Sequence, residues 1–115
     1  DAAGRGVFHA VEESRKAGKD VYAFGSNRNQ NNIAPDAILA SAAISPQAFV
    51  YVANLVKTGK FEPKIMWMGM AQNETVQLVY NPKLKARIPK EVQAKVEEVR
   101  QKILSGEFKA PRGKF

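Results

Sequence analysis

The residues best suited to chemistry lie in a polar loop that follows a short apolar segment. Residues 21–24, bounded by Gly25, are typical of a buried strand that runs into a turn. The loop side chains offer many hydrogen-bond donors and acceptors but a single charge; they are Ser26, Asn27, Arg28, Asn29, Gln30, Asn31 and Asn32. Open α/β sheets bind ligands beyond the carboxyl ends of their strands, which makes the loop a candidate binding site. The alternative is a surface loop rich in Asn because Asn tolerates turn geometry.

Composition argues against several kinds of site. The 115 residues include no cysteine and a single histidine, His9. Disulfides and thiolate metal sites are therefore excluded, and a histidine metal site or a Ser-His-Asp triad is nearly impossible within this chain. We expect neither catalysis nor a cofactor nor a metal, and we expect His9 to be packed or to face solvent. No segment approaches the roughly 18 apolar residues that a membrane span requires.

The positive charge is concentrated away from the polar loop. The net charge is +7, and from Lys83 onward ten basic residues stand against four glutamates. A nucleic-acid-binding protein is expected to carry its basic stripe where recognition occurs. We therefore interpret the basic residues mostly as a solvated face and expect no nucleic-acid partner; a nucleic-acid-binding or regulatory module is a less favoured alternative.

The sequence predicts a helix on the N-terminal side of the polar loop. Asp1–Gly6 is interpreted as a glycine-rich turn that leads into this helix, which has an apolar stripe at Val7, Phe8 and Val11 and ends at Gly18. Gly4 and Gly6 would let the backbone approach a ligand closely.

Further elements are expected on the C-terminal side of the loop. They are strands at 38–44, 65–70 and 75–80, a helix that begins near Pro46 and one that runs from Pro89 to Ser105. Ser45 is expected to cap the first helix, which is apolar almost all round and should be largely buried. In the second helix, Glu91 and Lys95 are expected to pair, as are Glu98 and Lys102.

A chain of 115 residues fits one small domain, and we predict a single α/β lobe over residues 1–115 with a basic tail at 107–115. The order of elements is typical of an α/β sandwich with a mainly parallel sheet and helices on both faces.

The chain also resembles a known family. AAGRGVFHAVEESRKAGKDVYAFGSN, APDAILASAAI, LVYNP and IPKEVQAKVEEVRQKILSGEFKAP follow one another in the order and at close to the spacing found in the C-terminal part of the basic membrane protein family. These proteins are substrate-binding lipoproteins of certain ABC transporters and include purine-nucleoside receptors. The matching segments cover essentially the whole chain.

The resemblance implies a fold, a function and partners. The fold would be a periplasmic-binding-protein-like (type I) lobe, completed by a missing N-terminal segment or a partner chain that supplies the other lobe and a strand before Asp1. The protein would be the extracytoplasmic solute-binding component of an ABC importer, working with its permease. It would be periplasmic or extracellular and anchored to the membrane through the missing segment. The alternative is a self-processing or enzymatic protein cleaved before Asp1.

The resemblance also implies where a ligand would bind. The family's glycine-rich loop is matched at residues 3–6, whereas Gly25 stands where an Asp that binds ribose is expected, and residues 70–72 stand where a Lys is expected. Neutral groups thus replace two charged contacts, each of which contributes roughly 1.5–3 kcal/mol. A nucleobase or another small polar solute is then expected rather than an ordinary nucleoside. The expected ligand-binding residues are Gly4, Arg5, Gly6, Gly25, Ser26, Asn27, Asn29, Met70 and Gln72.

Overall fold

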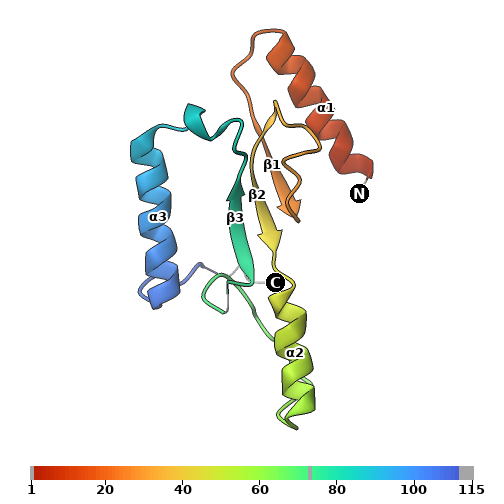
Figure 1. Ribbon diagram of the computed structural model, residues 1–115, viewed down its shortest axis with the longest axis vertical. Coiled ribbons are helices and arrows are strands. Elements are labelled where there is room, and N and C mark those ends of the chain that lie inside the picture. The colour runs from red at the N-terminus through yellow and green to blue at the C-terminus, as the bar shows by residue number, and fades with distance from the viewer. Residues whose placement is uncertain (1, 73, 112–115) are drawn as a thin grey trace. The chain divides into compact units, whose positions relative to one another are not determined.

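A computed structural model describes residues 2–72 and 74–111 of the chain (Figure 1). The elements in chain order are α1 (Ala2–Lys16), β1 (Ala23–Asn27), β2 (Ile38–Ile44), α2 (Gln47–Lys57), β3 (Val76–Tyr80), the 3-10 helix η1 (Lys85–Arg87) and α3 (Lys90–Ser105). The described residues form two compact units. The first unit comprises Asp1–Ile44 and Gln77–Ile88, and the second comprises Ser45–Val76 and Pro89–Phe115. Asp1 and residues 112–115 of the basic tail lie outside the described residues.

The sheet has three strands in the order β1-β2-β3. β1 and β2 are parallel, with Phe24 opposite Ala40 and Gly25 opposite Ser41. β3 runs in the opposite direction, as its arrow shows (Figure 1), and the Asn81 amide donates to the carbonyl of Leu39 at 3.0 Å. The α/β class is therefore confirmed, but the sheet is mixed rather than mainly parallel.

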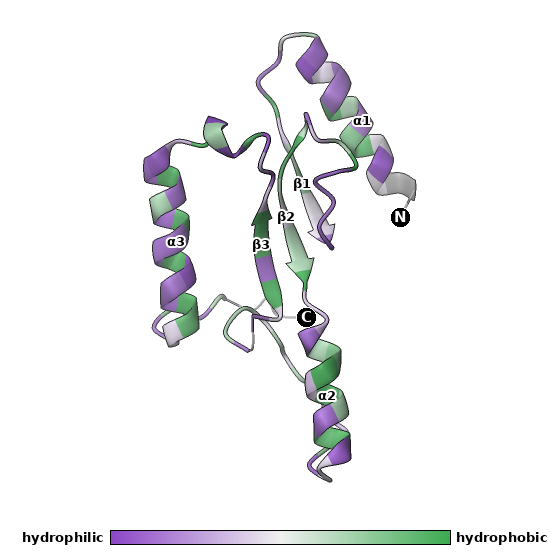
Figure 2. Cartoon of the chain, in the orientation of Figure 1, coloured by the Kyte–Doolittle hydropathy of each residue, from purple (hydrophilic) through white to green (hydrophobic). Residues whose placement is uncertain are grey.

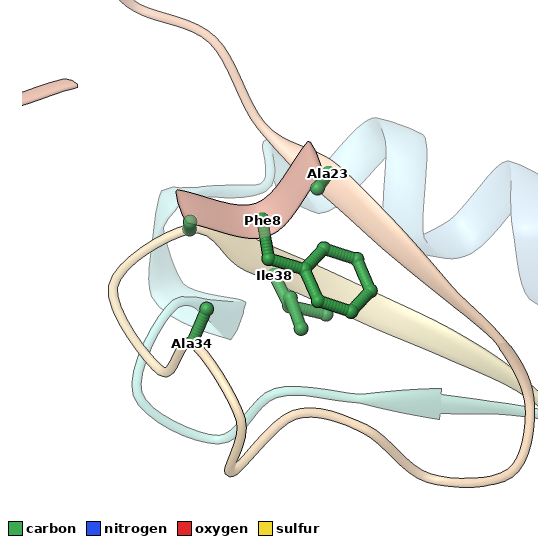
Figure 3. Packing of buried hydrophobic residues seen from close by; sticks show 5 residues of the cluster. Phe8, Ala23, Ala34 and Ile38 are labelled. Carbon is green, nitrogen blue, oxygen red and sulfur yellow. The ribbon is translucent and has the colours of Figure 1, made fainter. Parts of the chain in front are cut away.

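The core of the first unit is small and rich in alanine (Figure 3). Phe8 of α1 packs with Ala23 and with the fully buried Ile38. Ala34 and Ala37, from the connection between β1 and β2, complete the cluster. Small side chains let this connection lie close to the start of β1, where the Ala23 amide donates to the Ala37 carbonyl at 2.9 Å.

The expected glycine-rich turn before α1 is wrong for residues 2–6. α1 begins at Ala2, so both Gly4 and Gly6 are helical. Glycine costs about 1 kcal/mol relative to alanine in a helix, and the good helix formers beside these glycines offset this cost. The predicted end of the helix is confirmed, because Gly18 has φ +85° and its amide donates to the Arg15 carbonyl at 2.9 Å.

Within the second unit, α2 begins and ends close to its predicted bounds but is not buried. The N-cap is Pro46 rather than the expected Ser45, although the Gln47 amide donates to the Ser45 hydroxyl at 3.3 Å. None of the residues of α2 is buried, and Phe49 is 76% exposed. Figure 2 shows that apolar residues dominate this helix. The prediction of burial is therefore wrong for the described residues, because no other part of the second unit covers these side chains.

The predicted strand at 65–70 is also wrong. This segment has no regular secondary structure, and Ile65 and Trp67 are exposed. A strand needs a neighbour that supplies hydrogen bonds, and this segment instead leads into a turn in which the Gln72 amide donates to the Gly69 carbonyl at 3.2 Å. The strand expected at 75–80 is confirmed as β3.

Helix α3 follows the prediction closely. It ends before Gly106, whose φ of +80° is the left-handed conformation of a helix C-terminus. Lys102 pairs with Glu98 at 2.8 Å as expected, whereas Lys95 pairs with Glu98 at 2.9 Å rather than with Glu91. Glu98 therefore lies between two ammonium groups.

Candidate functional site

An open cavity of about 580 Å³ lies in the first unit, between the start of α1 and the end of β1. Its lining combines polar, aromatic and cationic side chains; the residues are Gly4, Val7, Phe8, Phe24, Ser26, Asn27, Arg28 and Gln30. A concave surface with apolar walls and a few polar groups is the usual form of a small-molecule site.

The end of β1 is shaped by close approach to β2. Gly25 is buried, and a Cβ added there would collide with the Ser41 hydroxyl and crowd the side chain of Gln30. Two residues later, Asn27 has φ +69°, a left-handed conformation that Asn tolerates better than most residues, and the strand ends there. The backbone thus turns at the point where the cavity begins.

A hydrogen-bond network fixes the loop that follows. The buried Ser41 hydroxyl donates to Asn31 Oδ1 at 2.7 Å and accepts from the Gln30 amide at 3.0 Å. Asn31 Nδ2 donates to the Val79 carbonyl at 3.1 Å. The side-chain oxygen of Gln30 accepts a hydrogen bond from the backbone amide of Ser26 at 2.8 Å, and this bond links the loop to β1. Asn31 and Ser41 therefore hold the loop in place rather than face a ligand.

The structure brings three of the predicted ligand residues to this cavity: Gly4, Ser26 and Asn27. Arg5 and Gly6 are exposed on α1 and do not line it. Gly25 is buried and does not line the cavity. Asn29 does not line it either, and its Oδ1 accepts a hydrogen bond from the backbone amide of Asn31 at 3.1 Å within the loop. The ligand-binding role of all these residues stays a prediction.

Met70 and Gln72 belong to the second unit. They line a cavity of about 890 Å³ in that unit, together with Trp67, Ile103 and Phe108 among others. Gln72 Oε1 accepts from the Gly69 amide at 2.9 Å, so one polar atom of this predicted contact is used within its own turn. The structure therefore does not join these two residues to the cavity of the first unit.

Sequence reasoning missed part of the lining. The sequence predicts Val7 and Phe8 as part of the core stripe of a helix and Phe24 as a buried strand residue. Phe8 is indeed buried, but Val7 and Phe24 are about 60% exposed. The sequence offers only the alternation of strand residues, which points Phe24 and Gly25 to opposite faces; the structure shows that Gly25 is the buried one.

The electrostatics of the cavity depend on Arg28. It is the only charged group among the described residues that line the cavity. The carboxylate of Asp36 does not line the cavity; it accepts a hydrogen bond from Lys83 at 2.7 Å, and this bond lowers the pKa of Asp36. The cavity can therefore offer hydrogen bonds, apolar contact and one positive charge.

Two further findings concern the described residues alone. Within residues 2–72 and 74–111, no group of three or more potential ligands could hold a metal ion. His9 is solvent-facing, as expected, and lies 3.9 Å from the carboxylate of Glu13.

The sequence is similar over 98% of its length to proteins named basic membrane proteins. It is 28% identical to basic membrane protein A1 of Borrelia garinii subsp. bavariensis and 29% identical to basic membrane protein A of Borreliella afzelii. The resemblance to a C-terminal part of the basic membrane protein family is confirmed. The chain spans about a third of the length of these curated relatives. No model of a protein family matches the sequence.

The names of the basic membrane proteins refer to a membrane. Of the helices in the described part of the chain, none has both the length and the apolar character needed to cross one.

Proposed function

We propose that this protein is the extracytoplasmic solute-binding component of an ABC importer and that it binds a small polar solute, such as a nucleobase or nucleoside. The observation that carries the proposal is the cavity at the end of β1, which joins carboxamide and hydroxyl groups to exposed apolar side chains. Similarity to basic membrane proteins over 98% of the chain supports the same function.

The proposed mechanism is closure of two lobes around the solute. Contacts formed only in the closed state would shift the equilibrium toward that state. The loop 28–32 is suited to such a site because Ser41 and Asn31 fix its backbone before a ligand arrives. A site that is already ordered loses less conformational entropy on binding.

A second polypeptide, or further chain, is proposed to supply the other lobe. The exposed apolar side chains of α2 support this proposal, since an apolar helix normally packs against another element. The membrane anchor and the permease are part of the same proposal. Native and denaturing mass spectrometry of purified material tests this directly: a second polypeptide that dissociates under denaturing conditions, or a single chain longer than these 115 residues, supports it, and a folded lone chain of 115 residues contradicts it.

Thermal unfolding with a panel of nucleosides, nucleobases and related metabolites tests solute binding. A ligand present at about 100 times its Kd stabilises a protein by roughly 2.7 kcal/mol, which raises the Tm of a small domain by roughly 10 °C or more. The variant Phe24→Ala should weaken the shift, because Phe24 lines the cavity. Phe61→Ala is the matched control, since Phe61 is also an exposed phenylalanine but lies in the other unit, outside α2 and outside the cavity lining. The absence of any shift across the panel would contradict the proposal.

A further inference from the structure

We propose that the cavity at the end of β1 selects solutes that carry an anionic group beside a flat apolar ring, with Arg28 as the anion-binding residue. This inference rests on the proposed function and names the class of solute. It differs from the expectation from sequence alone, in which neutral groups carried the recognition.

Arg28 is available to a ligand. It is exposed and lines the cavity, and no described residue pairs with its guanidinium or accepts a hydrogen bond from it. Arg15 in the same unit provides a contrast: it donates to the Val21 carbonyl at 3.1 Å and lies 4.0 Å from the centre of the Tyr22 ring. Arg15 is thus held by its own fold, whereas the donors of Arg28 remain open for carboxylate or phosphate oxygens.

The described lining contains no group that would repel an anion. No aspartate or glutamate is among its described residues. Arg28 is therefore the one charge that an anion would meet in the described lining, and its attraction is larger beside apolar walls than in open water.

The rest of the lining suits the body of such a solute. Phe24 is 61% exposed and Val7 is 60% exposed, so both offer apolar surface that water now covers. The Asn27 carboxamide, next to Arg28 in the chain, lines the same cavity and both donates and accepts hydrogen bonds. Phe24 and Arg28 line the same cavity, so a solute that fills it would meet both the ring and the guanidinium. Aromatic carboxylates and phosphorylated nucleosides share this chemistry.

Two matched pairs of probes test the inference by titration calorimetry on the purified protein. Nicotinate and nicotinamide differ by a carboxylate charge, and adenosine monophosphate and adenosine differ by a phosphate. We expect the anionic member of at least one pair to bind roughly tenfold or more tightly than its neutral counterpart, as a charge-assisted hydrogen bond implies. The pair that responds identifies the anion as carboxylate or phosphate.

Variants assign the preference to Arg28. Arg28→Gln should weaken binding of the anionic probe by roughly tenfold or more and change binding of the neutral probe little. Arg28→Lys keeps the charge and should retain part of the preference. Lys19→Gln removes an exposed charge from the same unit outside the cavity and is the matched control. Because Arg28 is exposed, these variants should fold, and circular dichroism would verify it.

The outcomes separate this inference from the proposed function. Equal binding of the two members in both pairs, or binding of another solute of the panel when none of the four probes binds, overturns the inference and leaves solute binding intact. An anion preference that survives in Arg28→Gln overturns the assignment to this residue. If neither these probes nor the wider panel of solutes binds, the proposed function fails and the inference fails with it.

Discussion

The hydroxyl oxygen of Ser41 occupies the space that a side chain at Gly25 would need. The two residues face each other across the parallel pair β1–β2, and a Cβ built on Gly25 would lie well within 3.0 Å of Ser41 Oγ. The same hydroxyl is bonded to Asn31 and to the Gln30 amide, so it cannot move aside without releasing the loop. Glycine at position 25 is thus a condition for the shape of the cavity.

Gly25→Ala should therefore destabilise the protein by about 1–3 kcal/mol, the usual cost of overpacking. The measurement is the free energy of unfolding in urea. Adding Ser41→Gly removes the colliding oxygen, so the double variant should lose less stability than the sum of the two single variants. Strict additivity would show that the two positions do not compete for the same space.

Gly6→Ala should have the opposite effect. Gly6 is an interior residue of α1, and a Cβ there would meet nothing within 4 Å. Alanine in a helix is favoured over glycine by about 0.5–1 kcal/mol, so the variant should unfold at a higher urea concentration. Solute binding should not change, because Gly6 lies outside the cavity lining. A loss of binding would instead support the role predicted for Gly6 from the sequence.

Tyr80→Phe should leave the protein as stable or raise its stability by about 1 kcal/mol. The hydroxyl of Tyr80 is buried without a hydrogen-bond partner among the described residues, and such a group loses its bonds to water on folding. Thermal unfolding of the two proteins provides the comparison. A clear loss of stability would mean that a bound water or another group satisfies this hydroxyl in solution.

The carboxylate of Glu98 should titrate far below its usual range. Hydrogen bonds from Lys102 and then Lys95, together with their charges, lower the pKa of Glu98 from 4.5 to about 2. Because the folded pKa is the lower one, the contribution to stability is present above pH 4.5 and is lost as the pH falls toward 2.

Carbon-detected NMR titration would give the pKa of Glu98 directly. Glu98→Gln is the control for stability, since its unfolding free energy should depend less on pH over this acidic range. High salt should bring the pKa back toward its usual value, because the group is exposed and its ion pairs are screened. A pKa near 4.5 at low salt would contradict the pairing.

Local sequence signals predicted the elements that depend on local interactions. Gly18 and Gly106 marked the ends of α1 and α3, and the apolar run at 38–44 matched β2 in full. The strand expected at 65–70 failed because a strand depends on a neighbour, which the composition of the segment cannot reveal. Burial of α2 failed for the same reason: periodicity reports which side chains are apolar, not what covers them.

The candidate site was predictable in position but not in composition. The polar loop and the end of β1 do lie at the cavity, with Ser26 and Asn27 in its lining. Most of the other polar residues of the loop are used by the fold itself, as with Asn31, whose partners lie on β2 and β3. Such pairings join residues as far apart as 31 and 79, and a single sequence does not state them.

The central position of β2 has a consequence for hydrogen exchange. β2 is bonded on both sides, whereas β1 forms one edge of the sheet. If β1 separated from β2, its amides would be exposed and its part of the cavity lining would be lost, while β2 and β3 would remain paired. A solute bound in the cavity should therefore slow deuterium uptake at the amides of residues 24–27. Exchange at this edge strand would reveal binding before the solute is identified.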